Sequence, residues 1–314
     1  MMFITFLIKA VIQGTPLLFG ATGEIITEKS GNLNLGIPGI MYIGAISSVI
    51  GGFLYKENAA VLVPALSILI PFISCLIGSL LASLIYGFLT ITLRANQNVT
   101  GLALTTFGIG FGNFFGGSLI KLTGSTTPYL ALSKLSSAYC SFLPFGTSGF
   151  LVYLAAVIAI IASFVIKRTR VGLQLRSVGE NPATADAAGI NVTRYKYFAT
   201  CIGGMIAGLG GLFYIMDYSG GIWQNDGFGD RGWLAIAIVI FALWKPIVAI
   251  FGSYIFGGLY ILYNYVNVNM QMQPLMKMLP YVVTVVVLIA VSVRRKREYQ
   301  PPASLGLSYF REDR

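Results

Sequence analysis

The sequence predicts an all-α, polytopic bundle of membrane-spanning helices. Of its 314 residues, 56% are apolar and only 10% are charged, against about 25% charged residues in soluble domains, and the mean hydropathy is +0.78. Continuous apolar runs, close to the ~20 residues that cross a bilayer, recur along the chain. A transmembrane β-barrel would instead show alternating segments of about ten residues. The whole chain, 1–314, is therefore predicted to form a single domain in a lipid bilayer.

The apolar runs predict about nine spans. They lie at roughly 3–22, 37–55, 60–93, 99–120, 148–167, 196–216, 232–245, 246–266 and 280–293. The first run lacks a preceding basic segment and contains Gln13 and Pro16, which favours a retained span over a cleaved signal peptide. The run 60–93 contains Pro64 and Pro71 and is either one broken helix or two short ones; we predict one.

The basic residues predict which side of the membrane each loop faces. With the N-terminus outside, fifteen basic residues fall on inner segments: Lys29, Arg94, Lys167, Arg168, Arg170, Arg176, Arg194, Lys196, Lys245, Arg294, Arg295, Lys296, Arg297, Arg311 and Arg314. Five fall on outer segments: Lys56, Lys121, Lys134, Arg231 and Lys277. Because basic residues concentrate in cytoplasmic loops, the basic tail 294–314 is predicted to be cytoplasmic. The net charge of +10 then needs no nucleic-acid partner.

The residue inventory excludes several kinds of chemistry. The sequence has no His and only three scattered Cys, which excludes imidazole metal ligands and His-based catalytic triads. It also lacks the G-x-x-x-x-G-K-[ST] loop that holds nucleotide phosphates. We therefore expect no catalytic residue, no metal site and no cofactor, and no ATP hydrolysis by the chain itself.

One polar loop, 168–195, interrupts the apolar sequence on the predicted cytoplasmic side. Within it, Asn181 is a good N-cap residue, Pro182 suits the first helical position, and Gly189 can end a helix in a left-handed conformation. The predicted helix of about seven residues is too short to be stable in isolation. Its small surface, with Ala185 facing a groove and Asp186 beside it, predicts a docking element for another protein. The alternative is a loop that packs only against its own helix ends.

Two further stretches combine Gly with polar residues and then become apolar. They read "GNLNLGIPGIMYIGA" (31–45) and "GFGDRGWLAIAIVIFA" (227–242), and they open two spans that run in opposite directions. Broken segments at corresponding positions of two halves are typical of an inverted repeat that lines a transport pathway. Irregular backbone at membrane depth needs protein or water beside it, so both stretches should face the interior.

Six polar or aromatic residues are candidates for the pathway lining. They are Asn32, Asn34, Trp223, Gln224, Asp226 and Arg231. Amides can hydrogen-bond a polar substrate, and an aromatic ring can stack on a planar one. The structural alternatives are helix caps for the two Asn residues, the interfacial aromatic belt for Trp223, and a surface ion pair of Arg231 with Asp226 or Asp230.

Two acidic residues bear on the choice between transporter classes. Glu24 and Glu28 are expected at the cytoplasmic end of the first span, in water beside Lys29. No acidic residue then falls in the middle of a predicted span. This counts against a proton-coupled carrier, which usually needs an ionisable group inside the membrane.

Several segments together resemble a known family. "LRSVGENPATADAAGINV" resembles the coupling loop of ABC-transporter permease subunits, in the group that serves branched-chain amino acids, simple sugars and nucleosides. "GEIITEKSGNLNLGIPGIMYIGA" and "FGDRGWLAIAIVIFALWKP" resemble two further signatures of this group, and the tail "PPASLGLSYFRE" is similar to its nucleoside-transporting branch. Pro38 departs from the pattern, because these permeases commonly have Glu there.

The resemblance implies an importer permease in the bacterial cytoplasmic membrane. Its loop helix, with Asn181, Pro182, Ala185, Asp186 and Gly189, would sit in a cleft of a separate ABC ATPase subunit. A second permease subunit, identical or homologous, and an extracytoplasmic substrate-binding (lipo)protein would complete the transporter. The expected substrate is a nucleoside, and a simple sugar or riboflavin-like compound is the alternative. A self-sufficient channel or secondary carrier is the alternative from a different class.

Overall fold

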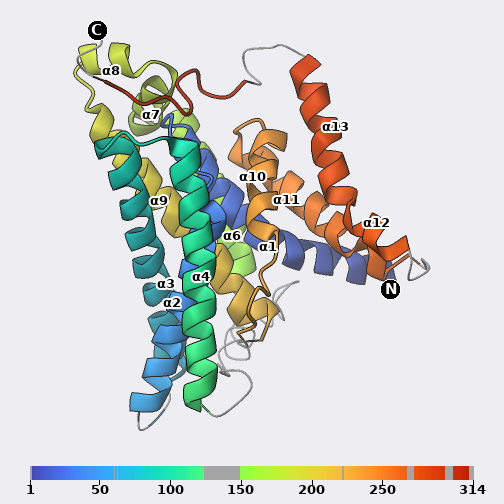
Figure 1. Cartoon of the computed structure of the whole chain (residues 1–314). Coiled ribbons are helices and arrows are strands. Elements are labelled where there is room, and N and C mark those ends of the chain that lie inside the picture. Colours follow the sequence, from blue (N-terminus) through green and yellow to red (C-terminus); the bar gives the residue numbers. More distant parts are fainter. Residues whose placement is uncertain are drawn as a thin grey trace.

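The computed structural model confirms a polytopic helical bundle (Figure 1). It describes residues 2–59, 61, 63–123, 149–220, 223–266, 272–293 and 300–310, and none of these forms a strand. The helices are α1 (Met2–Glu28), α2 (Ile37–Asn58), α3 (Pro64–Gly87), α4 (Gln97–Thr123), α6 (Leu151–Arg168), α7 (Arg170–Glu180), α8 (Pro182–Ala187), α9 (Val192–Phe213), α10 (Arg231–Phe241), α11 (Pro246–Ile261), α12 (Gln273–Lys277) and α13 (Leu279–Val293). π-Helical turns extend α3 (Phe88–Thr92) and α9 (Tyr214–Tyr218), and a 3-10 turn (Leu262–Asn264) follows α11.

Seven helices in the described part of the chain are long and apolar enough to cross a bilayer. Two shorter apolar helices, Arg231–Phe241 and Leu279–Ala290, accompany them. The run predicted as one span at 60–93 is one continuous helix, Pro64–Thr92, which Pro64 begins and Pro71 does not interrupt. The chain is therefore a multi-pass membrane protein.

The predicted span 232–245 is shorter than expected. α10 has 11 residues and is about 16 Å long at 1.5 Å per residue, which is half of a hydrocarbon core. The chain then turns at Leu243 and Trp244, whose φ angles are 52° and 54°. The Trp244 indole donates a hydrogen bond to Glu28 Oε2 at the end of α1, which holds this turn inside the bundle.

α1 and α9 lie at the centre of the bundle. α1 packs against α6, α9, α10 and α11, while α9 also packs against α2 and α3. Small residues allow the helices to approach closely. A Cβ placed on Gly23 of α1 would lie 2.2 Å from the carbonyl oxygen of Gly203 of α9, and one on Gly208 would lie 2.5 Å from Ser79 Cβ of α3.

The segments predicted to share one side of the membrane lie at one end of the bundle, here called the loop end. It comprises α7, α8, the turn after α1, the turn before α4, and tail residues 300–310 (Figure 1). The tail hydrogen bonds that join them include Ser304 Oγ to Gly179 O (2.6 Å), Gly306 N to Gly31 O (3.2 Å) and Ser308 Oγ to Arg94 O (3.4 Å). The basic run 294–297 of the predicted tail lies outside the described residues.

Candidate functional site

The polar loop 168–195 folds into two short helices, α7 and α8, of which the sequence predicted only the second. The predicted N-terminus of α8 is confirmed: Asn181 is the N-cap, its Oδ1 accepts the N–H of Thr184 at 3.0 Å, and Pro182 is the first helical residue. α8 itself has six residues, Pro182–Ala187.

The predicted end of α8 is also confirmed. Gly189 has a φ of +81°. Its N–H donates to Asp186 O at 2.9 Å, and the N–H of Ile190 donates to Ala185 O at 3.0 Å. This pair of bonds is the Schellman arrangement, which satisfies the last carbonyl groups of a helix.

The expectation that Ala185 faces a groove outside the chain is wrong. Its methyl group is 3% exposed and packs with Val178 of α7 and Val192 of α9. Asp186, next to it, accepts a hydrogen bond from Tyr309 Oη of the tail at 2.9 Å. Both residues therefore hold α8 against its own chain. The outward face of α8 consists of four exposed small residues, Ala183, Thr184, Ala187 and Ala188.

α7 joins α8 to the first interrupted stretch. A Cβ placed on Gly179, near the end of α7, would lie 2.3 Å from the carbonyl oxygen of Lys29. Burial lowers the pKa of the Lys29 ammonium group below its ordinary value, and the nearby carboxylate of Glu180 offsets only part of this effect. This backbone contact leaves no room for α7 to move towards the turn after α1 without displacing that turn.

The non-helical backbone that leads into α2, residues 30–36 and from here on called the first stretch, is folded inside the bundle. Asn32 is 1% exposed, and its Nδ2 donates to Thr200 Oγ1 of α9 at 3.2 Å. Asn34 is fully buried, its Oδ1 accepts the N–H of Gly36 at 2.9 Å, and its own N–H donates to Glu24 Oε1 at 2.9 Å. Both side chains thus brace the chain in this conformation, and neither lines an open path.

The expectation that Glu24 and Glu28 lie in water is wrong. They are 0% and 3% exposed, because the stretch 30–36 and the turn at Trp244 fold over the end of α1. Glu24 Oε1 meets the backbone of Asn34, whereas its Oε2 has no described hydrogen-bond partner. Glu24 and Glu28 are therefore ionisable groups buried at the end of α1, which weakens the case made from the sequence against a proton-coupled carrier.

The non-helical backbone that leads into α10, residues 223–230 and from here on called the second stretch, differs in its exposure. Trp223 is 1% exposed and fills the space beside Gly116, where a Cβ would lie 1.9 Å from the indole nitrogen. Trp223 therefore does not belong to an interfacial aromatic belt. Gln224 and Asp226 are exposed, and Asp226 Oδ1 accepts a hydrogen bond from Asn113 Nδ2 of α4 at 2.9 Å.

Arg231 does not form the surface ion pair with Asp226 or Asp230 that the sequence suggested. Its side chain is 6% exposed, its guanidinium donates to Phe228 O at 2.8 Å, and its Cζ lies 4.6 Å from the ring centre of Tyr214 and 4.9 Å from that of Tyr260. Burial in a cage of rings and carbonyl groups keeps this cation inside the protein, away from the exposed face.

The two stretches meet where their helices begin. A Cβ placed on Gly232, at the start of α10, would lie 2.5 Å from Pro38 Cβ at the start of α2. The N-termini of α2 and α10 therefore abut within the bundle, as expected if the two stretches belong to an inverted repeat. Pro38, where the resembling family commonly has Glu, forms this contact itself and places an apolar ring at the junction.

An exposed polar face beside the second stretch was missed by the sequence analysis. Thr106, Gly110, Asn113 and Gly117 follow one another at helical spacing along α4, and Gly110 and Gly117 border open space. The side chain of Asn113, near the middle of α4, makes both bonds to Asp226: its Nδ2 donates to Asp226 Oδ1 (2.9 Å), and its Oδ1 accepts the backbone N–H of Asp226 (3.2 Å). The available signal was an Asn in the middle of an apolar span.

Comparison with known proteins agrees with this architecture. The family described as "Branched-chain amino acid transport system / permease component" matches residues 6–291. A protein of Haloferax volcanii, provisionally named as a glucose ABC transporter permease protein, is 32% identical over 99% of both chains. A nucleoside ABC transporter permease protein of Lactococcus lactis is 33% identical over 88% of this chain and 89% of its own length. A guanosine ABC transporter permease protein of Bacillus subtilis is 30% identical over 79% of this chain and 78% of its own length. No solved structure matches.

The matched region spans α1 to α13 and includes both interrupted stretches and the loop with α7 and α8. The chain therefore belongs to the permease components of the branched-chain amino acid transport family and is an ABC transporter permease.

Proposed function

We propose that this permease is the membrane-spanning subunit of an ATP-driven importer for a nucleoside. In this proposal the loop end faces the cytoplasm, the N-terminus lies outside, and a separate ABC ATPase subunit binds α8. A second permease subunit completes the pathway, and an extracytoplasmic binding protein delivers the substrate. The chain itself has no nucleotide-phosphate loop, so the energy must come from another subunit.

The outward face of α8 is the observation that carries the ATPase assignment. Six residues are too few for a stable free helix, yet α8 is capped at both ends and anchored through Ala185 and Asp186. What it presents outward is a smooth face of Ala183, Thr184, Ala187 and Ala188. Such a rigid, small-residue helix fits the helix-in-groove type of recognition.

A path of direct contacts supports coupling from α8 to the centre. α8 packs on α7 through Ala185 and Val178, and Gly179 presses on the backbone of Lys29. The stretch 30–36 then leads to Pro38, which contacts Gly232 of α10. A displacement of α8 by an ATPase would thus reach the junction of the two helix starts through packed backbone, which is stiff enough to transmit it.

The exposed polar face of α4 and the second stretch is the proposed substrate pathway. Gln224, Asp226 and Asn113 offer amide and carboxylate groups, which can bind ribose hydroxyls and base edges. Two relatives, named as nucleoside and guanosine permeases, favour a nucleoside. The relative provisionally named as a glucose permease favours a simple sugar as the second candidate, since sugar hydroxyls suit the same side chains.

The ATPase assignment is tested by co-purification and uptake with the full set of subunits. Ala187→Arg places a charge on the exposed face of α8, so the isolated chain should fold normally while binding of the ATPase subunit is lost. The matched control is Asn58→Arg, at an exposed position at the opposite end of the bundle, which should bind the ATPase as the parent does. Normal co-purification of Ala187→Arg would show that α8 is only a connector.

The transporter class and substrate are tested by uptake into vesicles. ATP-dependent uptake of radiolabelled guanosine, competed by other nucleosides and not by glucose, is the expected result. Competition by glucose alone would select the sugar candidate. Uptake by the chain without any ATPase subunit would instead identify a secondary carrier, for which Glu24 and Glu28 would be the first residues to examine.

A further inference from the structure

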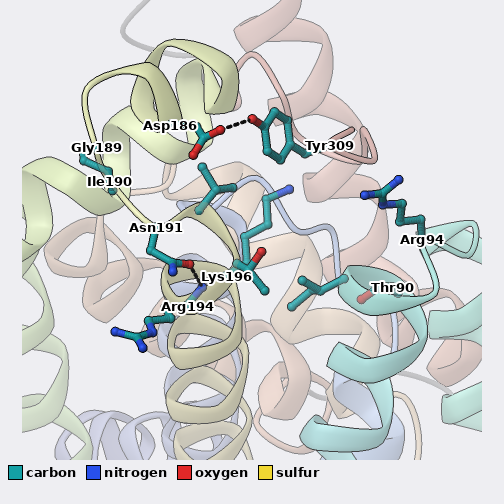
Figure 2. Close-up of a pocket in the computed structure, with 12 residues that line it drawn as sticks. Thr90, Arg94, Asp186, Gly189, Ile190, Asn191, Arg194, Lys196 and Tyr309 are labelled. Carbon is teal, nitrogen blue, oxygen red and sulfur yellow. Dashed lines mark hydrogen bonds between the residues drawn. The ribbon is translucent and has the colours of Figure 1, made fainter. Parts of the chain in front are cut away.

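A basic cavity lies at the loop end, outside the proposed substrate pathway. Its volume is about 650 Å³, and it is bounded by the end of α3, the turn before α4, the residues after α8, the start of α9 and Tyr309 of the tail (Figure 2). Three basic residues line it, Arg94, Arg194 and Lys196. The acid among its lining residues, Asp186, accepts the hydrogen bond of Tyr309.

Lys196 is the side chain of this cavity whose charge has no partner among the described residues. Its side chain is 3% exposed and makes no hydrogen bond or ion pair with a described residue. Figure 2 shows its amine directed into the cavity, towards the guanidinium of Arg94. Burying an ammonium group without a partner costs free energy, so an anion bound in the cavity would stabilise the charged form of Lys196.

The start of α9 adds to the same field. Asn191, Thr193 and Arg194, the N-cap and two residues of the first turn, line the cavity. The Asn191 side chain accepts only the N–H of Arg194, at 3.0 Å, whereas the first turn of a helix has further N–H groups without intrahelical partners. The N-terminus of a helix also carries partial positive charge and suits phosphate groups.

The basic cavity adjoins an apolar groove on the outer surface of the bundle. This groove has a volume of about 690 Å³ and shares Thr193 and Arg194 with the basic cavity. Its other lining residues come from α3 and α9 and include Leu84, Phe198 and Ile202. Phe198 and Ile202 are 66% and 44% exposed. A site with basic side chains at one end and exposed apolar side chains along a membrane helix matches an amphiphile with an anionic head.

We propose that an anionic phospholipid binds here, with its phosphate group in the basic cavity and an acyl chain in the groove between α3 and α9. Basic pockets between helices at the cytoplasmic side recognise lipid head groups in this way. In Figure 2 the side chain of Arg194 points away from Lys196, so Lys196 and Arg94 would hold the phosphate while Arg194 lies at the rim. The lipid would adjoin Asp186 and the end of α8. This inference rests on the proposed function in one respect, namely that the loop end faces the cytoplasm.

The test measures lipid retention by the purified full chain alone. The protein is incubated with an equimolar mixture of phosphatidylglycerol and phosphatidylcholine in detergent, and retained lipid is counted by native mass spectrometry. The parent should prefer phosphatidylglycerol. Lys196→Met should lower that preference about fivefold, since a basic residue near an anionic head group contributes roughly 1 kcal/mol. Lys167→Met, at an exposed basic position at the end of α6 that lines neither cavity, should not.

A second pair of variants tests the groove. Leu84→Trp should fill it and reduce retention of phosphatidylglycerol, whereas Leu66→Trp, at an exposed position near the start of α3, should not. Unchanged preference in Lys196→Met would overturn the proposal. Loss with Lys196→Met but full retention with Leu84→Trp would also overturn it, because the cavity would then hold a free anion such as inorganic phosphate.

The last test compares lipid retention by the isolated chain with lipid retention by the assembled transporter. If the assembled complex expels phosphatidylglycerol that the isolated chain retained, the site is a subunit interface and the proposal fails. The readout does not depend on transport. A chain that retains the lipid but imports nothing would refute the proposed function and leave this inference standing.

Discussion

The two interrupted stretches, 30–36 and 223–230, both combine Gly with polar residues but differ in their surroundings. Asn32 and Asn34 of the first are buried and bonded to α1, α9 or neighbouring backbone. Gln224 and Asp226 of the second are exposed, whereas Trp223 and Phe228 are buried and anchor it in the bundle. Both lead into helices whose first residues meet at Pro38 and Gly232.

The difference separates two tasks that one sequence pattern suggested for both stretches. The first stretch is the part that α7 presses on, so it is suited to receive movement from the loop end. The second carries the exposed polar groups, so it is suited to meet a substrate. We therefore expect mutations in the first stretch to act mainly on stability and coupling, and mutations of exposed groups beside the second to act mainly on affinity.

The largest expected effect concerns an anchor of the second stretch. Trp223→Ala removes a buried ring that fills the space beside Tyr42 and Gly116, and such a truncation costs about 3–5 kcal/mol. The melting temperature of the detergent-purified protein should fall sharply and uptake should be lost. Gln224→Ala, at the exposed neighbouring position, should melt like the parent. Equal melting temperatures for both variants would contradict the anchoring role.

A smaller loss of stability is expected in the first stretch. Asn34→Ala leaves the buried N–H of Gly36 without its acceptor, which costs about 1–3 kcal/mol. Chemical or thermal unfolding should register this loss. Asn34→Asp would keep the acceptor but add a charge beside Glu24 and should not restore the parent's stability. If Asn34→Ala were as stable as the parent but lost substrate affinity, Asn34 would be a pathway residue and the contrast between the two stretches would disappear.

The link between the first stretch and the loop end is tested by the cap of α8. Gly189 has a φ of +81° and no atom within 4 Å of its would-be Cβ, so Gly189→Val introduces backbone strain of about 1–2 kcal/mol without a clash. The protein should insert and fold, but ATPase activity stimulated by loaded binding protein should no longer drive uptake. Gly189→Asn, which tolerates this conformation better, should recover most of the coupling. Full coupling in the Val variant would argue that the cap is dispensable.

The smallest effect on stability is expected at Asn113. It is partly exposed, so Asn113→Ala, which removes its hydrogen bonds to Asp226, should cost no more than about 1 kcal/mol of stability. Loss of one hydrogen bond to the substrate corresponds to about 1 kcal/mol, or about a fivefold weaker apparent affinity in uptake assays. Asn58→Ala, at the far end of α2, is the control. An unchanged affinity would remove the exposed face of α4 from the pathway.

Local patterns predicted the local structures well. The caps of α8 followed from Asn181, Pro182 and Gly189, because capping depends on a few adjacent residues. The run 60–93 was predicted as one span and forms one, since its length and apolar composition outweigh Pro71. By contrast, the end of α10 could not be read from its apolar composition, because it depends on Trp244 bonding to Glu28, 216 residues away.

The candidate residues divide in the same way. Sequence spacing placed Asn32, Asn34, Trp223, Gln224, Asp226 and Arg231 in one pathway, whereas the structure exposes only Gln224 and Asp226 among them. Asn113 was missed because its importance depends on the partner that it meets, Asp226. Exposure and contact are properties of packing between distant segments, and no single segment carries them.

The sequence by itself determined that this protein lies in a lipid bilayer and that it forms a helical bundle. An apolar fraction of 56% and recurring runs of about 20 residues leave a helical membrane bundle as the stable state, because backbone groups in lipid must be satisfied within each segment. Only the tertiary structure decided which polar groups are enclosed. Glu24, Ala185 and Arg231 are buried because other segments fold over them, whereas Asp226 and the outward face of α8 are exposed because nothing described covers them. Burial arises from packing between helices that are far apart in the chain, and that packing decides which residues can meet a substrate or a partner.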